Sequence, residues 1–336
     1  MNKRSRKLTL KDIGNLAGVS RATVSRVIND YPHITPEVRE RVQKVIQETG
    51  YQPNRIAQSL VSNRTGVIGL VIPHVANTIL TNPYFLHLIN SITRATNQSD
   101  LTLALFLFHS TDEEDRIAKS IFNTNLVDGV IITADRREDS FVEQLVAHQV
   151  PLAFVGKPEP GIEVPYVNVD NFDGGYMATE HLIRRGYRRI GLITVLYNTA
   201  GEDRHAGYRQ ALEAHGIPYD DQLVVEGDFS LESGYIAMEH LLAQSVEAVF
   251  VLSDLMAIGA QRAVREAALR MPDDVAMVGY DDLPQAVMAD TPLTTIRQPV
   301  DELGQVAVEL LQQAIAEPMK PLEPCVLPVE LIQRDT

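Results

Sequence analysis

The sequence has little cysteine and no long apolar run. Cys325 is the single cysteine among 336 residues, so an internal disulfide bond is excluded and a reducing compartment suits the chain. The longest apolar runs, such as 101–108, are far shorter than the roughly 18 residues that a membrane-spanning helix needs. No apolar stretch follows the basic N-terminus, so the pattern predicts no secretory signal. We therefore expect a cytoplasmic protein with no membrane partner.

Motifs of catalytic and cofactor sites are missing as well. The first apolar run is not followed by Gly-x-Gly-x-x-Gly, and neither a Walker A motif nor a Gly-x-Ser-x-Gly elbow occurs. The nine histidines are scattered without the spacing of metal ligands. The adjacent pair Asp281 and Asp282 would point in different directions. The sequence therefore predicts no enzyme, no cofactor and no metal site.

Positive charge is scarce overall, since 30 Lys and Arg face 44 Asp and Glu, and the net charge is −14. That balance alone argues against a nucleic-acid partner, because DNA repels an acidic protein. The charge is distributed unevenly, however. Residues 1–65 contain twelve basic and five acidic side chains, a net charge of +7, which leaves −21 on the other 271 residues. The basic segment is therefore expected to contact nucleic acid.

The same 65 residues have the pattern of short helices. Thr9 and Ser20 can each cap a helix, and Gly18 separates the two helices. Thr35, followed by proline, can cap a third helix that ends at Gly50. Two helices joined by a glycine-containing turn predict a helix-turn-helix, whose second helix inserts its N-terminal side chains into the major groove. A small helical bundle with a solvated basic face is the alternative.

From about residue 66 onward, short apolar runs alternate with helical patterns. The runs are 67–72, 101–108, 127–133, 152–155, 167–169, 190–196, 224–225, 248–252 and 275–280. Continuous apolar strands separated by helices indicate parallel sheets that are covered on both faces. Because these strands exceed what one small doubly wound domain needs, we expect an α/β body of two lobes, each with a doubly wound parallel sheet.

Several ordered motifs along the whole chain point to one family. They are TLKDI at 9–13, AGVS at 17–20, TVSRVIN at 23–29, GYQPNRIAQSL at 50–60, VGYDD at 278–282, PLTTI at 292–296 and LPV at 327–329. With these motifs the sequence resembles the lactose-repressor (LacI) family of bacterial transcription regulators. The resemblance implies a helix-turn-helix headpiece (1–52), a hinge helix (53–65) and a periplasmic-binding-protein-like body (66–336). Its lobes would comprise about 66–168 with 297–327, and about 169–296 with 328–336.

The resemblance also assigns DNA contacts. The base-reading positions are Arg21, Ala22 and Arg26, the backbone-contacting positions are Leu10, Ser20, Asn29 and Asn54, and Ala57 and Leu60 lie in the hinge segment. Ala22 can contact only a thymine methyl, so Arg21 and Arg26 should carry the direct readout, for example of guanine O6 and N7. Leu60 matches the hinge leucine that wedges into the minor groove, with ordinary hinge packing as the alternative.

The expected small-molecule site lies at the carboxyl ends of the strands, where open α/β sheets bind ligands. The candidates are Tyr84, Phe85, Lys157, Arg204, Phe229, Asp254 and Asp281, of which the resemblance implies Arg204, Phe229 and Asp281 as effector contacts. An arginine, a carboxylate and aromatic rings suit a polyol. Alternatives stay open: Asp254 can cap a helix, Tyr84 and Phe85 can belong to the lobe core, and the role of Lys157 is unassigned. Asp170 and Asn171 are interpreted as a helix cap and lobe connection rather than ligand contacts.

Two departures from the family pattern bear on the ligand. The loop 74–82 is longer than usual, which leaves the nearby pocket positions open. The purine-binding branch has a second arginine six residues before the position of Arg204, where this chain has Asn198. This favours a sugar or sugar derivative, whereas Arg204 with Lys157 would tolerate a phosphate.

The sequence therefore predicts an effector-responsive regulator, acting as a repressor, that binds a pseudo-palindromic operator as a homodimer. A purine-responsive, corepressed regulator is the alternative. Two more distant alternatives use the same α/β body. A sugar-binding transport protein would need export, and the basic headpiece argues against it. An enzyme would need catalytic motifs, which the sequence lacks.

Overall fold

The computed structural model describes residues 8–51, 64–75, 82–108, 111–124, 126–133, 140–318 and 321–336. The chain divides into two compact units, Met1–Thr65 and Gly66–Thr336, and each is described by itself. The hinge positions Asn54, Ala57 and Leu60 lie outside the described residues, as does most of the loop 74–82.

The first unit is a three-helix headpiece of α1 (Leu10–Ala17), α2 (Arg21–Ile28) and α3 (Pro36–Thr49). Thr9 and Asp12 cap α1 reciprocally, since the hydroxyl of Thr9 accepts from the backbone N–H of Asp12 while the Asp12 carboxylate accepts from Thr9. The Ser20 hydroxyl accepts from the backbone N–H of Thr23 and so begins α2. Thr35 is the N-cap of α3 as predicted, but its side chain makes no capping hydrogen bond.

The turn between α1 and α2 depends on two glycines. Gly18 has a φ of 64°, the left-handed conformation that favours glycine and ends α1. At Gly14, a Cβ would lie 2.8 Å from the carbonyl oxygen of Val19, so a side chain would push the turn away from the helix. The helices then enclose a small core made of Ile13, Ala17, Val24, Val27 and Val42. The predicted helix-turn-helix is confirmed.

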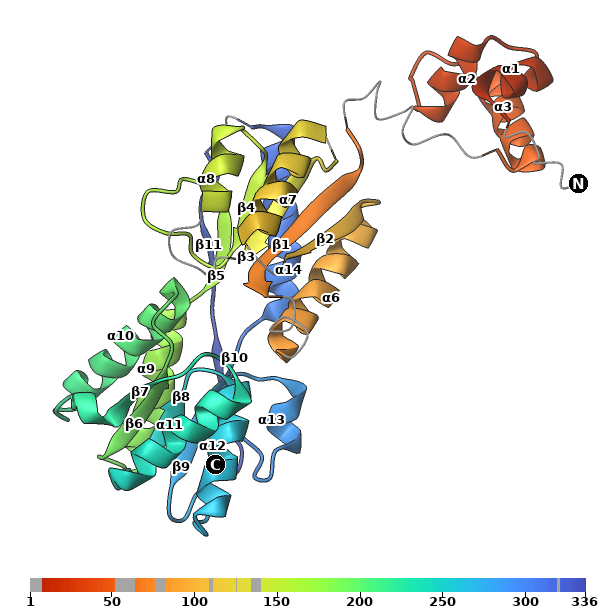
Figure 1. The fold of residues 1–336 in the computed structure, drawn as a ribbon. Helices are drawn as coiled ribbons and strands as arrows, with labels where there is room; N and C mark the ends of the chain where they lie inside the picture. Colours follow the sequence, from red (N-terminus) through yellow and green to blue (C-terminus); the bar gives the residue numbers. More distant parts are fainter. Residues whose placement is uncertain are drawn as a thin grey trace, which may run out of the picture. The chain divides into compact units, whose positions relative to one another are not determined.

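The second unit contains two six-stranded sheets with helices on both faces (Figure 1). The first sheet has the order β11-β5-β4-β3-β1-β2 and is parallel throughout. Its strands are β1 (Val67–Val75), β2 (Thr102–Phe108), β3 (Gly129–Thr133), β4 (Leu152–Val155), β5 (Tyr166–Val169) and β11 (Cys325–Leu327). Helices α6 (Pro83–Gln98) and α14 (Val300–Ala316) pack on one face, and α7 (Thr111–Thr124) and α8 (Ser140–Ala147) on the other. These elements form the first lobe.

The second lobe is built on the sheet β12-β10-β9-β8-β6-β7. Its strands are β6 (Ile190–Thr194), β7 (Val224–Glu226), β8 (Ala248–Val251), β9 (Ala276–Asp281), β10 (Thr294–Arg297) and β12 (Glu330–Ile332). Its helices are α9 (Asn171–Arg184), α10 (Thr199–Ala214), α11 (Leu231–Ala243), α12 (Asp254–Glu266) and α13 (Pro284–Met288), with the short 3-10 helix Asp221–Leu223. The two doubly wound sheets confirm the predicted α/β body.

One strand departs from the predicted parallel arrangement, because β12 pairs with β10 in the antiparallel direction. The other pairs of this sheet are parallel. The chain enters β12 directly from β11 of the first lobe, without a helix in between. A strand that starts at the lobe boundary must run away from it, whereas its neighbours run toward it, so β12 is antiparallel.

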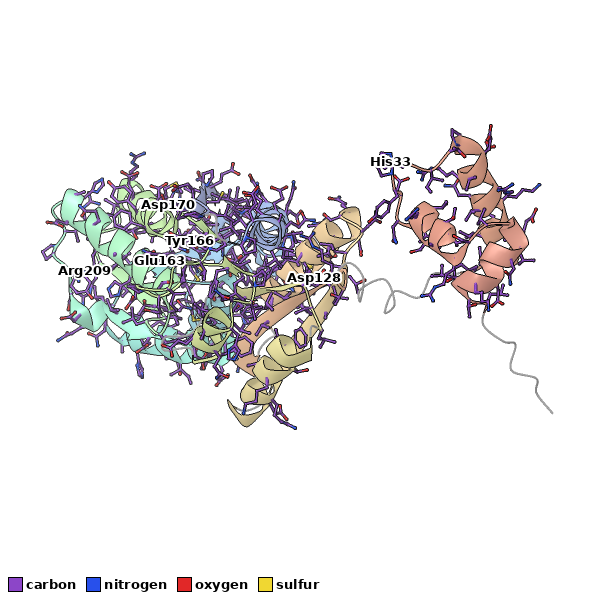
Figure 2. The ribbon with its side chains drawn as sticks, turned by 90° about the horizontal axis from the view of Figure 1, so that it is seen from above. His33, Asp128, Glu163, Tyr166, Asp170 and Arg209 are labelled. Atoms are coloured by element: carbon purple, nitrogen blue, oxygen red, sulfur yellow. The ribbon has the colours of Figure 1, made fainter. Side chains whose placement is uncertain are left out.

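The chain passes between the two lobes three times (Figure 1). It leaves β5 through Asp170 into α9, returns from β10 through Gln298 into α14, and leaves β11 through Pro328 into β12. The side chain of Asp170, labelled in Figure 2, caps α9 by accepting a hydrogen bond from the backbone N–H of Asp173. The lobes are therefore joined by three short connections.

Helices α9 and α10 approach each other unusually closely. A Cβ at Gly175 of α9 would lie against the carbonyl oxygen of Arg204 on α10, and one at Gly207 of α10 would meet the carbonyl oxygen of Phe172. Both contacts would be closer than 3.0 Å, which real Cβ atoms essentially never show. Only glycine permits this backbone approach, and it fixes where α10 presents Arg204.

Candidate functional site

A cavity of about 760 Å³, counting the space at its open mouth, lies between the two lobes of the second unit. Residues from the carboxyl ends of both sheets line it, among them Thr133 of β3, Val169 of β5 and Asp281 of β9. This is the place that the strand order of open α/β sheets favours for a ligand. Five of the seven predicted effector positions line it, namely Tyr84, Phe85, Arg204, Phe229 and Asp281.

The guanidinium of Arg204 is held in one orientation. It is buried, its Nε donates to Oδ1 of Asn171 at 2.8 Å, and its Nη1 donates to the carbonyl oxygen of Leu252 at 2.7 Å. Its face stacks on the ring of Tyr280, 3.6 Å from the ring centre. The remaining N–H groups are donors that a ligand can use without paying for side-chain ordering.

Asp281 supplies an acceptor on the same wall. Its carboxylate accepts a hydrogen bond of 2.7 Å from Nε2 of Gln298, which follows β10. Burial raises the pKa of Asp281 to about 6, although the nearby Arg204 guanidinium and the hydrogen bond from Gln298 lower it. A donor and an acceptor that are both fixed can bind neighbouring hydroxyl groups of a polyol.

Two pocket residues have an unusual backbone. Phe229 has a φ of 64° and Asp281 a φ of 119°, and neither residue type favours such values. Strained conformations of this kind concentrate at functional sites. The ring of Phe229 lies edge-on to Tyr197, with centroids 6.0 Å apart, and both rings line the cavity. They offer an aromatic wall on the second lobe.

Tyr84 and Phe85 form the aromatic wall on the first lobe. They lie in the first turn of α6, behind the N-cap residue Asn82, with ring centroids 5.5 Å apart. Tyr84 is half-buried, whereas Phe85 is buried and belongs to the core cluster of this lobe. Both interpretations of Phe85, as a core residue and as a cavity residue, therefore apply, because it packs in the core and also lines the cavity.

Asp254 and Lys157 do not line the cavity. Ser253 caps α12, and the Asp254 carboxylate is fully buried, where it accepts from the hydroxyl of Thr295 and the backbone N–H of Leu283. Burial and the nearby carboxylate of Asp281 raise the pKa of Asp254 well above its ordinary value. These hydrogen bonds keep it inside the lobe, behind the wall formed by Asp281.

Lys157 follows Gly156, a residue that lines the cavity. Its Nζ lies 3.9 Å from the Asp203 carboxylate, and its carbonyl oxygen accepts from the hydroxyl of Thr199. Both partners belong to α10, so Lys157 connects the two lobes next to Gly156, which does line the cavity.

Several lining residues were not among the predicted contacts: Asn82, Thr133, Asn168, Asn171, Tyr197, Asn198 and Gln298. Most of them stand at or just after the end of an apolar run, and that signal could have found them. Asn171 was interpreted as part of a helix cap, but Asp170 alone makes the cap while the Asn171 amide bonds to Arg204 and Asn168.

On the headpiece, Arg21, Ala22 and Arg26 are exposed along one side of α2, whereas Val24 and Val27 on the other side are buried in the core. Ser20 and Asn29 at the two ends of α2 are exposed as well, and Leu10 is half-buried at the start of α1. The predicted base-reading side chains therefore share a face that the core leaves open.

Among the residues that the structure describes, no helix is both long and apolar enough to cross a membrane. The described residues also contain no group of three or more His, Cys, Asp or Glu placed to hold a metal ion.

The raised pKa of Asp281 predicts how stability changes with pH. A carboxyl that holds its proton more tightly when folded contributes stability that is lost as the pH rises from about 4 to about 6. Asp281→Asn removes this titration, so the variant should lose less unfolding free energy than the wild type across that range. Urea denaturation at several pH values measures the difference, and equal slopes for both proteins would contradict the assignment.

Comparison with known proteins agrees with both units. Residues 9–54 match the model of bacterial regulatory proteins of the lacI family, and residues 179–336 match a periplasmic binding protein-like domain. The HTH-type transcriptional regulator CelR of Thermobifida fusca is 38% identical, and the alignment covers 99% of each chain. The chain belongs to the lacI family of bacterial regulatory proteins.

Other members of the lacI family match over most of their length. The transcriptional repressor PurR of Erwinia tasmaniensis is 36% identical, with 91% of this chain and 90% of PurR covered. The structure of a CelR–cellobiose complex aligns with a TM-score of 0.78 at 36% identity, covering 98% of this chain and 99% of the other. A lac repressor dimer bound to operator and an anti-inducer aligns with a TM-score of 0.84 at 28% identity, with the same coverage. The chain is therefore a DNA-binding transcriptional regulator rather than an enzyme.

Proposed function

We propose that this regulator is a sugar-responsive repressor that binds a pseudo-palindromic operator as a homodimer. The observation that carries the effector class is that the fixed guanidinium of Arg204, the carboxylate of Asp281 and the ring of Phe229 line the same cavity. Donors, acceptors and an aromatic face together suit a sugar ring. The likeness to CelR, whose structure contains cellobiose, supports the same class.

A purine effector is the second candidate, because PurR is among the relatives. In this chain Asn198 stands six residues before Arg204, and its Oδ1 accepts from the backbone N–H of Gly201 at 2.8 Å to cap α10. The position therefore offers no second guanidinium to a purine, and the sugar is favoured.

A thermal-shift screen distinguishes the two candidates, because a ligand that binds the native state raises the melting temperature. Cellobiose, glucose and related sugars form one set, and adenine, guanine and hypoxanthine form the other. Stabilisation by a sugar supports the proposal, whereas stabilisation by purines alone contradicts it.

In this proposal, residues 1–52 contact DNA, and residues 53–65, which include Leu60, form the hinge. Exposed apolar side chains on the body, such as Leu86, Leu105 and Met288, are available as subunit contacts. The lac repressor dimer supports the same assembly. Effector binding would favour one arrangement of the lobes and thereby change operator affinity, a coupling typically worth about 1–3 kcal/mol.

Arg26→Ala should weaken operator binding by about 1–3 kcal/mol and relax the preference at one base position, because a bidentate contact to guanine is lost. Binding to a set of operators with single base changes measures this. The exposed Arg41 on α3 provides a control, since Arg41→Ala should leave the base preference unchanged. If Arg26→Ala weakened all sequences equally, Arg26 would contact only the phosphate backbone.

A further inference from the structure

Thr133, the last residue of β3, has a buried hydroxyl that finds no partner among the described residues. The residue is 5% exposed, it lines the cavity, and its Oγ1 makes no hydrogen bond to the described residues. Buried polar groups in native proteins are nearly always hydrogen-bonded, so such a hydroxyl calls for an explanation. Its place on the cavity wall indicates that a ligand supplies the partner.

The other polar side chains that the structure describes on this side of the cavity are uncharged. Asn82 and Asn168 line it, and each uses its Oδ1 internally, to accept from the N–H of Tyr84 and from the amide of Asn171. Their side-chain NH₂ groups are uncharged hydrogen-bond donors. Tyr84 and Phe85 add the aromatic surface described above.

The charged lining residues that the structure describes, Arg204 and Asp281, both belong to the second lobe and have opposite signs. Lys157, which follows the lining residue Gly156, is outside the lining, and its Nζ lies 3.9 Å from the Asp203 carboxylate. A phosphate group placed against the first lobe would therefore lose its water without gaining a cation from the described lining, and such burial is unfavourable.

We propose that the first-lobe end of the cavity binds an uncharged sugar ring through the hydroxyl of Thr133, and that the effector is a neutral disaccharide rather than a sugar phosphate. One ring lies against Tyr84 and Thr133, and the other lies against Phe229, Arg204 and Asp281. Each lobe thus offers an aromatic side chain and hydrogen-bonding groups to one of the two sugar rings. This inference rests on the proposed sugar-responsive function and deepens it.

A matched pair of variants tests the role of the hydroxyl. Thr194 ends β6 as Thr133 ends β3, is 1% exposed and also has an unpartnered Oγ1, but it does not line the cavity. Thr133→Val should weaken cellobiose binding, measured by calorimetry, about five- to tenfold, which is the loss expected for one hydrogen bond. Thr194→Val should leave the affinity within about twofold of the wild type.

Both substitutions remove a hydroxyl that has no partner among the described residues, so neither variant should melt below the wild type, and operator binding by both should be unchanged. An unchanged cellobiose affinity of Thr133→Val, or an equal loss in Thr194→Val, would overturn the assignment.

The second arm compares cellobiose with its 6-phosphate derivatives. The neutral sugar should bind at least about tenfold more tightly, because the described residues of the first-lobe wall offer no cation to a phosphate. Tighter binding of a phosphorylated sugar would overturn this inference and leave the sugar-responsive function in place. Binding of a purine with no binding of any sugar would overturn the function itself.

Discussion

Replacing Arg204 with alanine is expected to weaken effector binding by about a hundredfold or more and to leave operator binding intact. The guanidinium donates charged hydrogen bonds from a buried position, and its two protein partners, Asn171 and the carbonyl oxygen of Leu252, fix its direction. Without it the Asn171 amide also loses its anchor at the cavity wall. The loss of effector affinity should therefore exceed the loss caused by removing any single neutral hydrogen bond.

The matched control is Arg209→Ala. Arg209 follows on the same helix α10, and its guanidinium lies over the ring of Tyr219 at 4.7 Å, outside the cavity lining. Calorimetry with the sugar identified by thermal shift, together with operator binding with and without that sugar, separates the two variants. A full response to the sugar in Arg204→Ala, or an equal loss in Arg209→Ala, would remove Arg204 from the effector site.

Gly175→Ala is expected to lower the unfolding free energy by about 3 kcal/mol, because overpacking between close elements forces the backbone to move. The new methyl group would meet the carbonyl oxygen of Arg204, which cannot rotate away as a flexible side chain can. The shift of α10 that relieves the clash also moves the Arg204 guanidinium, so effector affinity should fall together with stability.

Gly191→Ala serves as the comparison for that substitution. A Cβ at Gly191 in β6 would approach methyl groups of Leu241 and Val246 at 3.1–3.3 Å, and these groups can adjust. We expect a change of less than about 1 kcal/mol in urea denaturation. If Gly175→Ala were as stable as Gly191→Ala, the close contact of α9 with α10 would not constrain the fold.

Local signals predicted the headpiece well. The limits of α1 and α2 follow from Thr9, Gly18 and Ser20, whose capping interactions involve residues within a turn of the helix end. The alternation of apolar runs and helical patterns likewise predicted two wound sheets, because central strands such as β3, β4, β6 and β8 are apolar along most of their length. The direction of β12 could not be predicted this way, since it depends on which lobe the chain has just left.

The sequence predicted those cavity residues that simply follow the end of a strand. It did not predict residues whose place depends on contacts with distant parts of the chain. Asp254 follows a strand as a ligand residue would, yet its carboxylate bonds to Thr295, 41 residues away, and is buried. Gln298 lies near Asp281 because β10 pairs with β9, a register that no local pattern specifies. Thr133 is one of many threonines in the chain, and only the fold shows that its buried hydroxyl lies on the cavity wall without a partner among the described residues.

The three short connections also restrict how one lobe can rotate relative to the other, because any rotation must bend all three. Asn171 and Gln298, which line the cavity, stand at two of them. A ligand that touches these residues acts almost at the axis of rotation, where displacements are small, while the far ends of the lobes move in proportion to their distance from that axis. A small displacement at the cavity therefore corresponds to a larger displacement at the far ends of the lobes.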